Sequence, residues 1–595
     1  MLILEKIKYK VDRILFYILF IIVVAILFCV TLQVFSRYLL NAPVVFTEEL
    51  VRFLLIWLGL LGGAYTFGVK GHISLTLLID KFSLKAKNIL NIIIDIIVLF
   101  LAIFVLIIGG MKLISLTHNQ LSSVLAIPMW WVYSCTPISG VIILFYQIYY
   151  IIKNIFSIKG GKMSLSIIAL IVVFAIFLFL GVPISVTIAL SSLIVMLLHL
   201  PFDMSVLTAS QSLLNSLNSF PLLAIPLFIL SGSIMNTGGL ALRLINFAKL
   251  ITGKLPSPLW HINVLANMFF GALSGSAVAA EVAVGKIIHP LQDKEGYDMP
   301  FSTAVNITSC TTGLLIPPSN TYIVYSLVSG GTSIAALFFA GYIPGILMGL
   351  GIMVTCLVLS IKNKTKIVRE KIPVKEQLII VLRAIPSLFL IVVIIGGIVM
   401  GIFTATEGAG IAAVYSLILS LCYRTLNLKK IMDIVQDTVI LSGVSLFLVA
   451  SSSIMSWILS YSQIPELVAR GLLSISSNPL IILLIINFIL LIVGCFIDMT
   501  PAVLIFTPIF LPIVKEIGMH PVHFGIMLTY NLCIGLMTPP VGNALFLGCS
   551  LTGKKIEEVV PKMIPIFIVL LIILFLVTYI PSVCLFLPKL AGLLN

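Results

Sequence analysis

The chain is 595 residues long, 61% of its residues are hydrophobic, 9% are charged, and its net charge is +14. Soluble domains carry about 25% charged residues, so this composition excludes a soluble protein. Apolar runs of about 20 residues, the length that a helix needs to cross a bilayer, recur along the sequence and predict an all-α polytopic membrane protein. The excess of Lys and Arg is typical of cytoplasmic loops facing anionic membrane lipids, and it indicates no nucleic-acid partner.

The first part of the chain, residues 1–160, predicts about four transmembrane helices. They correspond to apolar runs at residues 14–36, 50–69, 88–111 and 128–152. Lysines follow the second run, at residues 70–87, and the fourth, at residues 153–162, and the N-terminus is also basic. Because basic residues concentrate in cytoplasmic loops, these three zones place both ends of the four-helix part in the cytoplasm.

A short linker at residues 153–162 leads into the second part, which contains an internal repeat. Three strings recur in the same order, each about 220 residues later. They are Gly181-Val182-Pro183, matched loosely by Gly401-Ile402-Phe403; Ile234-Met235, matched by Ile454-Met455; and Gly313-x-x-x-Pro317-Pro318, matched by Gly535-x-x-x-Pro539-Pro540. We therefore predict two halves, residues 161–380 and residues 381–595.

The two halves are expected to have opposite orientations in the membrane. Three basic residues, Arg243, Lys249 and Lys254, indicate a cytoplasmic stretch in the first half, whereas the corresponding residues 462–476 of the second half contain only Arg470. Inverted repeats of this kind are common in secondary transporters. The number of crossings between residues 153 and 220 stays open.

Four polar interruptions lie inside otherwise apolar sequence. They are Ser274-Gly275-Ser276, the stretch from Gly313 to Asn320, Asp498-Met499-Thr500-Pro501, and the stretch from Gly535 to Asn543. Ser276 precedes Pro317 by 41 residues, and Asp498 precedes Pro539 by the same interval. Broken backbone survives at membrane depth only when it is buried in protein or lines a wet cavity. Each half is therefore predicted to contain one re-entrant hairpin and one span that is broken at a double proline.

The chemistry of these interruptions suits a small cation beside an acid. Unwound carbonyls and helix C-termini attract cations, whereas helix N-termini attract carboxylates. Hydroxyl, amide and carboxylate oxygens are hard ligands, appropriate for Na⁺ rather than a transition metal. A carboxylate at membrane depth costs at least ~2.5–3.5 kcal/mol, so we expect Asp498 to be an ion ligand, with a structural hydrogen-bonded role as the alternative. Glu281 and Glu407 are weaker candidates, and a solvated charge near Lys286 is as good an interpretation of Glu281.

The sequence contains no motif of an enzyme or an ATP-driven pump. It has neither an H-E-x-x-H string nor a P-loop, and His520 and His523 have no evident further metal ligand. These absences favour a secondary transporter that is not an enzyme. An integral-membrane enzyme and a passive channel are the rival hypotheses from other classes.

The residues of both parts resemble a known transporter family. The long part is similar to the large (M) membrane subunit of tripartite ATP-independent periplasmic (TRAP) transporters, and the short part is similar to the small (Q) subunit. The matching strings are Gly181-Val-Pro-Ile184, Gly271-Ala-Leu-Ser-Gly-Ser276, Pro317-Pro-Ser-Asn320, Phe403-Thr-Ala-Thr-Glu407 and Thr538-Pro-Pro-Val-Gly-Asn543 in the long part, and Glu48-Glu49-Leu-Val-Arg52, Trp57, Gly62-Gly63 and Lys70-Gly-His-Ile73 in the short part. The order of the parts resembles a fused QM protein.

This resemblance implies a function and a mechanism. The protein would be a monomeric, multi-pass protein of the bacterial inner membrane that imports an organic acid with Na⁺ as the coupling ion. A separate extracytoplasmic solute receptor (P subunit) would deliver the acid. The M part would work as an elevator transporter, and the Q part would enlarge its scaffold. The best guess for the solute is sialic acid (N-acetylneuraminate). The runner-up function is a receptor-independent sodium- or proton-coupled dicarboxylate carrier.

The resemblance also assigns residues to three subsites. The residues of sodium site one would be Ser276, Gly313, Pro317 and Asn320. Those of sodium site two would be Asp498, Thr500, Gly535, Thr538 and Asn543. The solute would bind at Ser274, Gly275, Ser276 and Thr500.

Overall fold

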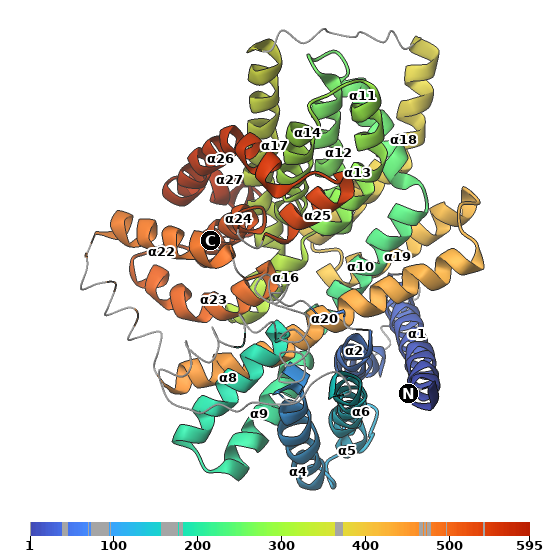
Figure 1. Cartoon of the computed structure of the whole chain (residues 1–595), viewed down its shortest axis with the longest axis vertical. Coiled ribbons are helices and arrows are strands. Elements are labelled where there is room, and N and C mark those ends of the chain that lie inside the picture. The colour runs from blue at the N-terminus through green and yellow to red at the C-terminus, as the bar shows by residue number, and fades with distance from the viewer. Residues whose placement is uncertain are drawn as a thin grey trace. The chain divides into compact units, whose positions relative to one another are not determined.

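In the computed structural model, the regular secondary structure of the described residues is helical, apart from a single isolated bridge between Leu121 and Pro128 (Figure 1). It describes residues 2–38, 46–69, 71–72, 94–95, 97–155, 177, 182–362, 373–462, 468, 472, 476, 478–495, 497–539 and 542–594. Eleven helices among these residues are long and apolar enough to cross a membrane. The prediction of an all-α polytopic membrane protein is therefore confirmed. The linker predicted at residues 153–162 lies outside the described residues from residue 156 onward.

The chain divides into two compact units that do not follow chain order. Unit 1 combines Met1–Pro226 with Val435–Ile464, and unit 2 combines Leu227–Ile434 with Pro465–Asn595. A segment of the second predicted half thus belongs to the same unit as the whole small-subunit-like part. The interruptions that the sequence singles out all lie in unit 2.

Unit 1 holds the four spans predicted for the small-subunit-like part. Its helices are α1 (Leu2–Tyr38), α2 (Phe46–Gly68), η2 (Ala102–Gly109), α4 (Gly110–Leu116), α5 (Met129–Tyr133), α6 (Cys135–Ile155), α8 (Ile184–His199), α9 (Phe202–Leu217), η3 (Phe220–Leu223) and most of α20 (Leu428–Tyr461). The four candidate spans before residue 160 are Lys8–Arg37, Phe46–Gly68, Ile97–Leu116 and Met129–Gln147. The third ends five residues beyond the predicted run.

Helix α2 is the packing centre of unit 1. It packs against α1 and α6, and it approaches α20 so closely that a β-carbon added to Gly62 would stand 2.9 Å from the Cα of Gly443. Small residues permit such close crossings in membranes, where dispersion and hydrogen bonds hold helices together. Its first turn also fixes a loop, because the buried Glu49 carboxylate accepts hydrogen bonds from the backbone N–H groups of residues 123–125 and from the Ser122 hydroxyl.

Unit 2 contains the interrupted helices. Its helices are most of α10 (Ala224–Thr237), α11 (Leu240–Thr252), α12 (Pro258–Ser274), α13 (Ala277–Lys294), α14 (Met299–Cys310), α15 (Thr312–Leu315), α16 (Asn320–Val328), α17 (Ile334–Lys362), α18 (Val374–Val399), α19 (Ala405–Cys422), α22 (Pro479–Gly494), α23 (Met499–Glu516), α24 (Pro521–Leu536), α25 (Asn543–Thr552), α26 (Ile556–Tyr579) and α27 (Pro581–Leu590).

Two sets of five helices repeat within unit 2. The helices α12, α13, α14, α16 and α17 correspond in order to α22, α23, α24, α25 and α26, and the first residues of corresponding helices lie 221 to 223 positions apart. The start signals repeat as well. Both α14 and α24 have a proline in the first turn, preceded by a capping side chain, Asp298 in one and His520 in the other. Proline is favoured at the start of a helix, where its missing N–H is not needed.

Candidate functional site

The first hairpin consists of α12 and α13, which pack together, and its tip is Ser274-Gly275-Ser276. Helix α12 ends with Gly275 at φ +60°, a left-handed conformation that glycine adopts without a steric penalty. Ser276 is the N-cap residue of α13, and its hydroxyl accepts a hydrogen bond of 3.3 Å from the N–H of Ala279. The chain reverses direction here because the glycine that ends α12 is followed at once by the residue that caps the N-terminus of α13.

The first tip lies against the first double-proline break. A β-carbon added to Gly275 would stand 2.7 Å from the carbonyl oxygen of Pro318. One turn earlier the backbones cross, since a β-carbon added to Gly313 would stand 2.6 Å from the Cα of Gly271. The break itself separates the short helix α15 from α16 and includes Pro317. Sodium-site-one residues are thus brought together around one tip and one break.

At the first break, the side-chain oxygen of Asn320 lacks a hydrogen-bond partner among the described residues. Asn320 is the first residue of α16, and its Oδ1 atom is buried. A buried polar atom without a partner costs about 1–3 kcal/mol. A bound cation would remove this cost, and an amide oxygen is a ligand that Na⁺ accepts.

The second hairpin repeats the first one. Helix α22 ends at Gly494 and α23 begins at Met499, with Asp498 in the N-cap position. A β-carbon added to Gly535 would stand 2.5 Å from the Cα of Gly494, so this hairpin crosses its break as closely as the first one does. The Asp498 carboxylate accepts a hydrogen bond of 3.0 Å from the Asn543 amide at the start of α25. Thr500, the other predicted residue of this tip, is the second residue of α23.

Backbone carbonyls gather at the second break. Helix α24 ends at Leu536, and the chain turns back so that a β-carbon added to Gly542 would stand 2.9 Å from the carbonyl oxygen of Thr538 and 3.1 Å from that of Leu536. The Thr538 hydroxyl donates to the carbonyl of Ile534, at 2.6 Å. Pro540 and Val541 lie outside the described residues.

The four interruptions meet inside unit 2. The downstream arm of the first hairpin, α13, packs against α25, and the downstream arm of the second hairpin, α23, packs against α16 (Figure 1). The Thr321 hydroxyl lies 3.0 Å from the Met499 sulfur across the second of these contacts. Each hairpin therefore touches the helix that follows the break of the other half.

Buried amide contacts fix the upstream arm of each hairpin, and the sequence analysis missed them. In the first half the Asn267 amide donates to the Ser309 hydroxyl of α14, at 2.7 Å. In the second half Asn531 of α24 donates to the Asn487 side chain of α22. Ser309 and Asn531 lie 222 positions apart, at matching positions of the repeat, and Asn267 and Asn487 lie 220 positions apart, close to the repeat interval. Aligning the two halves for polar residues inside apolar runs is therefore the signal that could have found these contacts.

Two acidic residues that the sequence left as weaker candidates have different surroundings. Glu407 forms a capping box with Thr404 at the start of α19 and accepts a 2.8 Å hydrogen bond from the Thr404 N–H. Glu281 lies in α13 with no exposed surface, and its Oε1 atom has no hydrogen-bond partner among the described residues. The interpretation of Glu281 as a solvated charge near Lys286 is wrong, because α13 turns this side chain into the unit.

The histidines of α24 have structural partners. His520 accepts a hydrogen bond from the Val522 N–H as the helix cap, and the His523 ring lies 2.7 Å from the carbonyl oxygen of Val577. The described part of the chain contains no group of three or more His, Cys, Asp or Glu side chains that could hold a metal ion. The predicted residues at the tips and breaks offer carbonyl, hydroxyl and amide oxygens together with one carboxylate. Oxygen ligands of this kind fit an alkali cation.

Comparisons with known proteins identify the family of the chain. The family model for the DctM component of the tripartite ATP-independent periplasmic transporter matches residues 171–583. The chain belongs to the TRAP transporter family. The model for the DctQ component of the same transporters matches residues 26–157, so this TRAP protein joins small and large membrane subunits in one chain. It is a transporter permease of the inner membrane and not an enzyme.

Relatives of the same fused layout match over nearly the full length. An isethionate TRAP transporter permease of Oleidesulfovibrio alaskensis is 33% identical over 94% of this chain and 92% of its own length. A sialic acid TRAP transporter permease of Haemophilus influenzae is 29% identical over 94% of this chain and 96% of its own length. The crystal structure of the Alcanivorax borkumensis YdaH transporter shares the fold, with a TM-score of 0.51 and 12% identity over 69% of this chain and 98% of that one.

Proposed function

We propose that this TRAP protein is a sodium-coupled secondary active importer of an organic acid, which a separate extracytoplasmic solute receptor delivers. The observation that carries the proposal is the meeting of two hairpin tips and two broken spans inside one compact unit. Such interruptions are stable at membrane depth only where they are buried in protein or line a wet cavity, and a transport site inside the protein would provide such a place. Two related permeases are named as transporters of organic acids, isethionate in one and sialic acid in the other.

The sodium ions would occupy the two tip-and-break contacts. Site one would use Ser276, Gly313, Pro317 and Asn320, and the unpartnered oxygen of Asn320 supports it. Site two would use Asp498, Thr500, Gly535, Thr538 and Asn543, and the contact between Asp498 and Asn543 supports it. Sodium at either site would hold a tip against its break and so favour the loaded conformation.

The acid would bind near Ser274, Gly275, Ser276 and Thr500. Ser276 is the N-cap residue of α13 and Thr500 lies in the first turn of α23, where helix N-termini offer N–H groups to a carboxylate. Neighbouring sodium ions would offset the charge of the acid. Two sodium ions with a monoanion would carry one net positive charge inward, which the membrane potential favours by ~2.3 kcal/mol per 100 mV. Sialic acid is our best candidate for the solute.

We assign the moving body of an elevator mechanism to unit 2, because it contains every interruption. Unit 1 would be the scaffold, and the small-subunit-like helices would enlarge it in a single protomer. The matched helix order of the two halves supports the internal repeat. If the halves are inverted, as the basic residues of the sequence predict, the repeat permits two related states with opposite access.

The proposal is tested with the purified chain in liposomes. Uptake of N-acetylneuraminate should require both external sodium and an added soluble receptor, and should proceed against a solute gradient. Equal uptake in potassium would contradict sodium coupling. Equal uptake without receptor would favour the receptor-independent carrier, and failure to accumulate the solute would favour a passive channel.

A further inference from the structure

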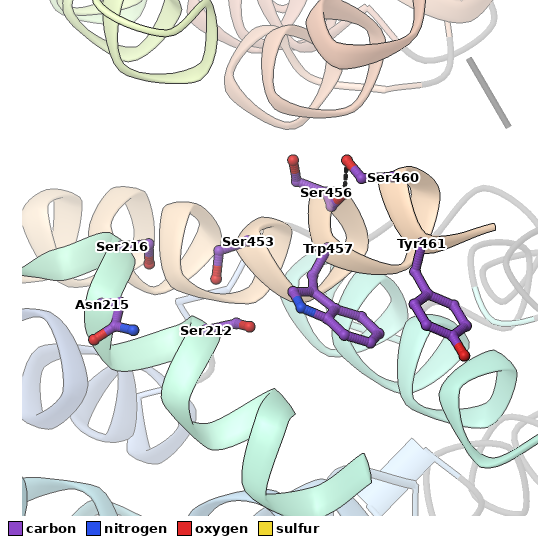
Figure 2. A pocket seen from close by; sticks show the side chains of 8 residues that line it. All are labelled: Ser212, Asn215, Ser216, Ser453, Ser456, Trp457, Ser460 and Tyr461. Atoms are coloured by element: carbon purple, nitrogen blue, oxygen red, sulfur yellow. Dashed lines mark hydrogen bonds between the residues drawn. The ribbon is translucent and has the colours of Figure 1, made fainter. Parts of the chain in front are cut away.

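Polar side chains inside apolar helices can bond to the backbone of their own helix. In unit 1, serines of this kind line a pocket between α9 and α20, as Figure 2 shows. Ser216, Ser453 and Ser460 each donate a hydrogen bond of 2.7–2.9 Å to a backbone carbonyl three or four residues earlier. A hydroxyl can do so because it carries a donor hydrogen, whereas an ionised carboxylate only accepts. An ionised glutamate inside a helix therefore needs donors from its neighbours.

Glu281 of unit 2 lacks such donors. Its side chain, on α13, has no exposed surface, and its Oε1 atom has no hydrogen-bond partner among the described residues. Its Oε2 atom lies 3.7 Å from the Cys310 sulfur of α14. The single hydrogen of this thiol has a nearer acceptor, because the carbonyl oxygen of Ile307 lies 3.1 Å from the same sulfur. A thiol is in any case a weak donor, so the carboxyl is left without a strong one.

The helices around Glu281 supply no positive charge to it. Helix α13 packs chiefly against α11, α12, α14, α15 and α25, and of these described helices only α11 contains Lys or Arg. Arg243 of α11 lies over the Tyr423 ring, at 3.4 Å from its centre, and Lys286 of α13 is exposed. The ion pairs among the described residues do not include Glu281.

The titratable groups that interact with the Glu281 carboxyl are thiols. Cys310 approaches it from α14 and Cys549 from α25, and thiols are neutral at physiological pH. The other titratable or charged residues on these helices are Arg243 and Lys249 of α11, His261 of α12, and Lys286, His289, Asp293 and Lys294 of α13 itself.

A proton suits this place better than a metal ion does. Burial of an ionised carboxylate without a partner is so costly that such a group takes up a proton instead. Hard metal ions are held by several oxygen atoms. The Oε1 atom lies instead beside Gly548 of α25, where an added β-carbon would meet both Oε1, at 2.6 Å, and the Ile307 side chain. A proton needs no further ligand, and it removes the buried charge.

Helix α25 connects Glu281 with the second predicted sodium site. Gly548 lies five residues after Asn543, the first residue of α25, which is roughly 7.5 Å along the helix. The Asn543 amide donates to the Asp498 carboxylate. An outward shift of α25 would expose the Glu281 carboxyl to water and withdraw Asn543 from Asp498. Packing of α25 onto α13 therefore favours a protonated Glu281 and a complete sodium site two at the same time.

We propose that Glu281 is a proton-binding site, whose carboxyl takes up a proton from solvent as α25 packs onto α13, so that this TRAP protein binds a proton together with its sodium. The link to sodium rests on the proposed function, whereas the proton site itself does not. Because coupling between two binding sites is reciprocal, protons should tighten sodium binding, and sodium should tighten proton binding by the same factor.

The first experiment tests the proton site without sodium. The purified full-length chain is unfolded thermally in potassium chloride from about pH 5 to about pH 9, above the range in which an exposed glutamate ionises. The folded wild type keeps a proton that the unfolded chain has released, so its stability should fall as the pH rises. Glu281→Gln resembles the protonated carboxyl and should lack this loss, while His261 and His289 contribute equally to both chains.

The expected result is a difference between the two chains that depends on pH. The unfolding temperature of Glu281→Gln should exceed that of the wild type by more at high pH than at low pH. Glu281→Asp, which keeps the acid, should retain the pH dependence of the wild type. The matched control is Glu295→Gln, at an exposed position just after α13, which should follow the wild type. Parallel curves for wild type and Glu281→Gln would overturn the proton site.

The second experiment tests the link to sodium. Sodium chloride is added to the same chains in weakly buffered detergent solution with a pH indicator, and potassium chloride is the blank. For each sodium ion bound, the wild type and Glu295→Gln should take up more protons than Glu281→Gln does. Equal proton uptake in wild type and Glu281→Gln would overturn the link. Loss of a sodium-binding component in Glu281→Gln would make Glu281 a metal ligand and overturn the proposal. Absence of sodium binding by the wild type would overturn the proposed function, while the first experiment still decides the proton site.

Discussion

The Asn543 amide donates a 3.0 Å hydrogen bond to the Asp498 carboxylate and thereby joins the tip of the second hairpin to the start of α25. The two residues are 45 positions apart in the sequence, and each stands at an interruption of an apolar helix. A carboxylate that accepts a hydrogen bond from one neutral amide has oxygen lone pairs left for a further partner. In our account this partner is a sodium ion.

Asp498→Asn tests the charge at this tip. The substitution keeps the size of the side chain and removes the negative charge, so we expect sodium-dependent uptake to fall to background while the protein keeps its fold. The measurement is solute uptake in liposomes beside a thermal unfolding curve. Asp293→Asn, on an exposed position of α13, is the matched control and should transport normally. Full uptake by Asp498→Asn with unchanged sodium dependence would remove Asp498 from the ion site.

Gly271→Ala and Gly494→Ala test the backbone crossings between hairpins and breaks. A methyl group at either position meets the backbone of Gly313 or Gly535. Overpacking of this kind typically costs about 1–3 kcal/mol, so the thermal unfolding temperature should fall in both variants. Gly396→Ala in α18, where an added β-carbon meets nothing within 4 Å, should unfold like the wild type. Equal unfolding temperatures in all three variants would show that the close crossings are absent.

Glu49→Gln tests the anchored loop of unit 1. The carboxylate accepts hydrogen bonds from the backbone N–H groups of residues 123–125, at 2.6–3.1 Å. A Gln side chain would place its NH₂ group against some of these backbone N–H groups, so that fewer of them find an acceptor. Amide hydrogen exchange at residues 123–125 should therefore become faster. Glu48→Gln, on the exposed neighbour, is the control. Slow exchange retained in Glu49→Gln would mean that other contacts hold the loop.

Thr404→Ala tests the capping box at the start of α19. The Thr404 hydroxyl accepts from the Glu407 N–H at 3.3 Å, and the Glu407 carboxylate accepts from the Thr404 N–H. Loss of an N-cap side chain costs about 1 kcal/mol, which a denaturation curve can resolve, and Thr404→Ser should recover most of the stability. Sodium-dependent uptake should persist in Thr404→Ala. If its uptake were lost at unchanged stability, Glu407 would belong to the transport site.

The sequence predicted the interruptions well because their signals are local. Prolines and polar residues inside an apolar run break a helix wherever they stand, so Ser276, Pro317 and Asp498 could be placed at tips and breaks without a structure. The repeat also predicted that each hairpin tip is paired with one double-proline break. The structure bears out this arrangement, and the ligand roles stay predictions.

The features that the sequence missed depend on contacts between distant residues. Nothing in the sequence around Gly494 indicates a close crossing, which depends on the position of Gly535 in the folded chain. Glu281 looked equally like a solvated charge, because the direction of a side chain on α13 is decided by the packing of α14 and α25. The inclusion of α20 residues in unit 1 likewise rests on tertiary contacts such as that between Gly62 and Gly443.

Direct binding of sodium to the purified chain tests the central claim, which is that the paired interruptions bind alkali cations. Titration calorimetry of the wild-type chain with sodium chloride should give saturable binding that potassium chloride does not reproduce. Asp498→Asn should lose one component of that binding, whereas Asp293→Asn should keep both. Sodium binding that is absent from the wild-type chain, or identical in wild type and Asp498→Asn, would contradict the account.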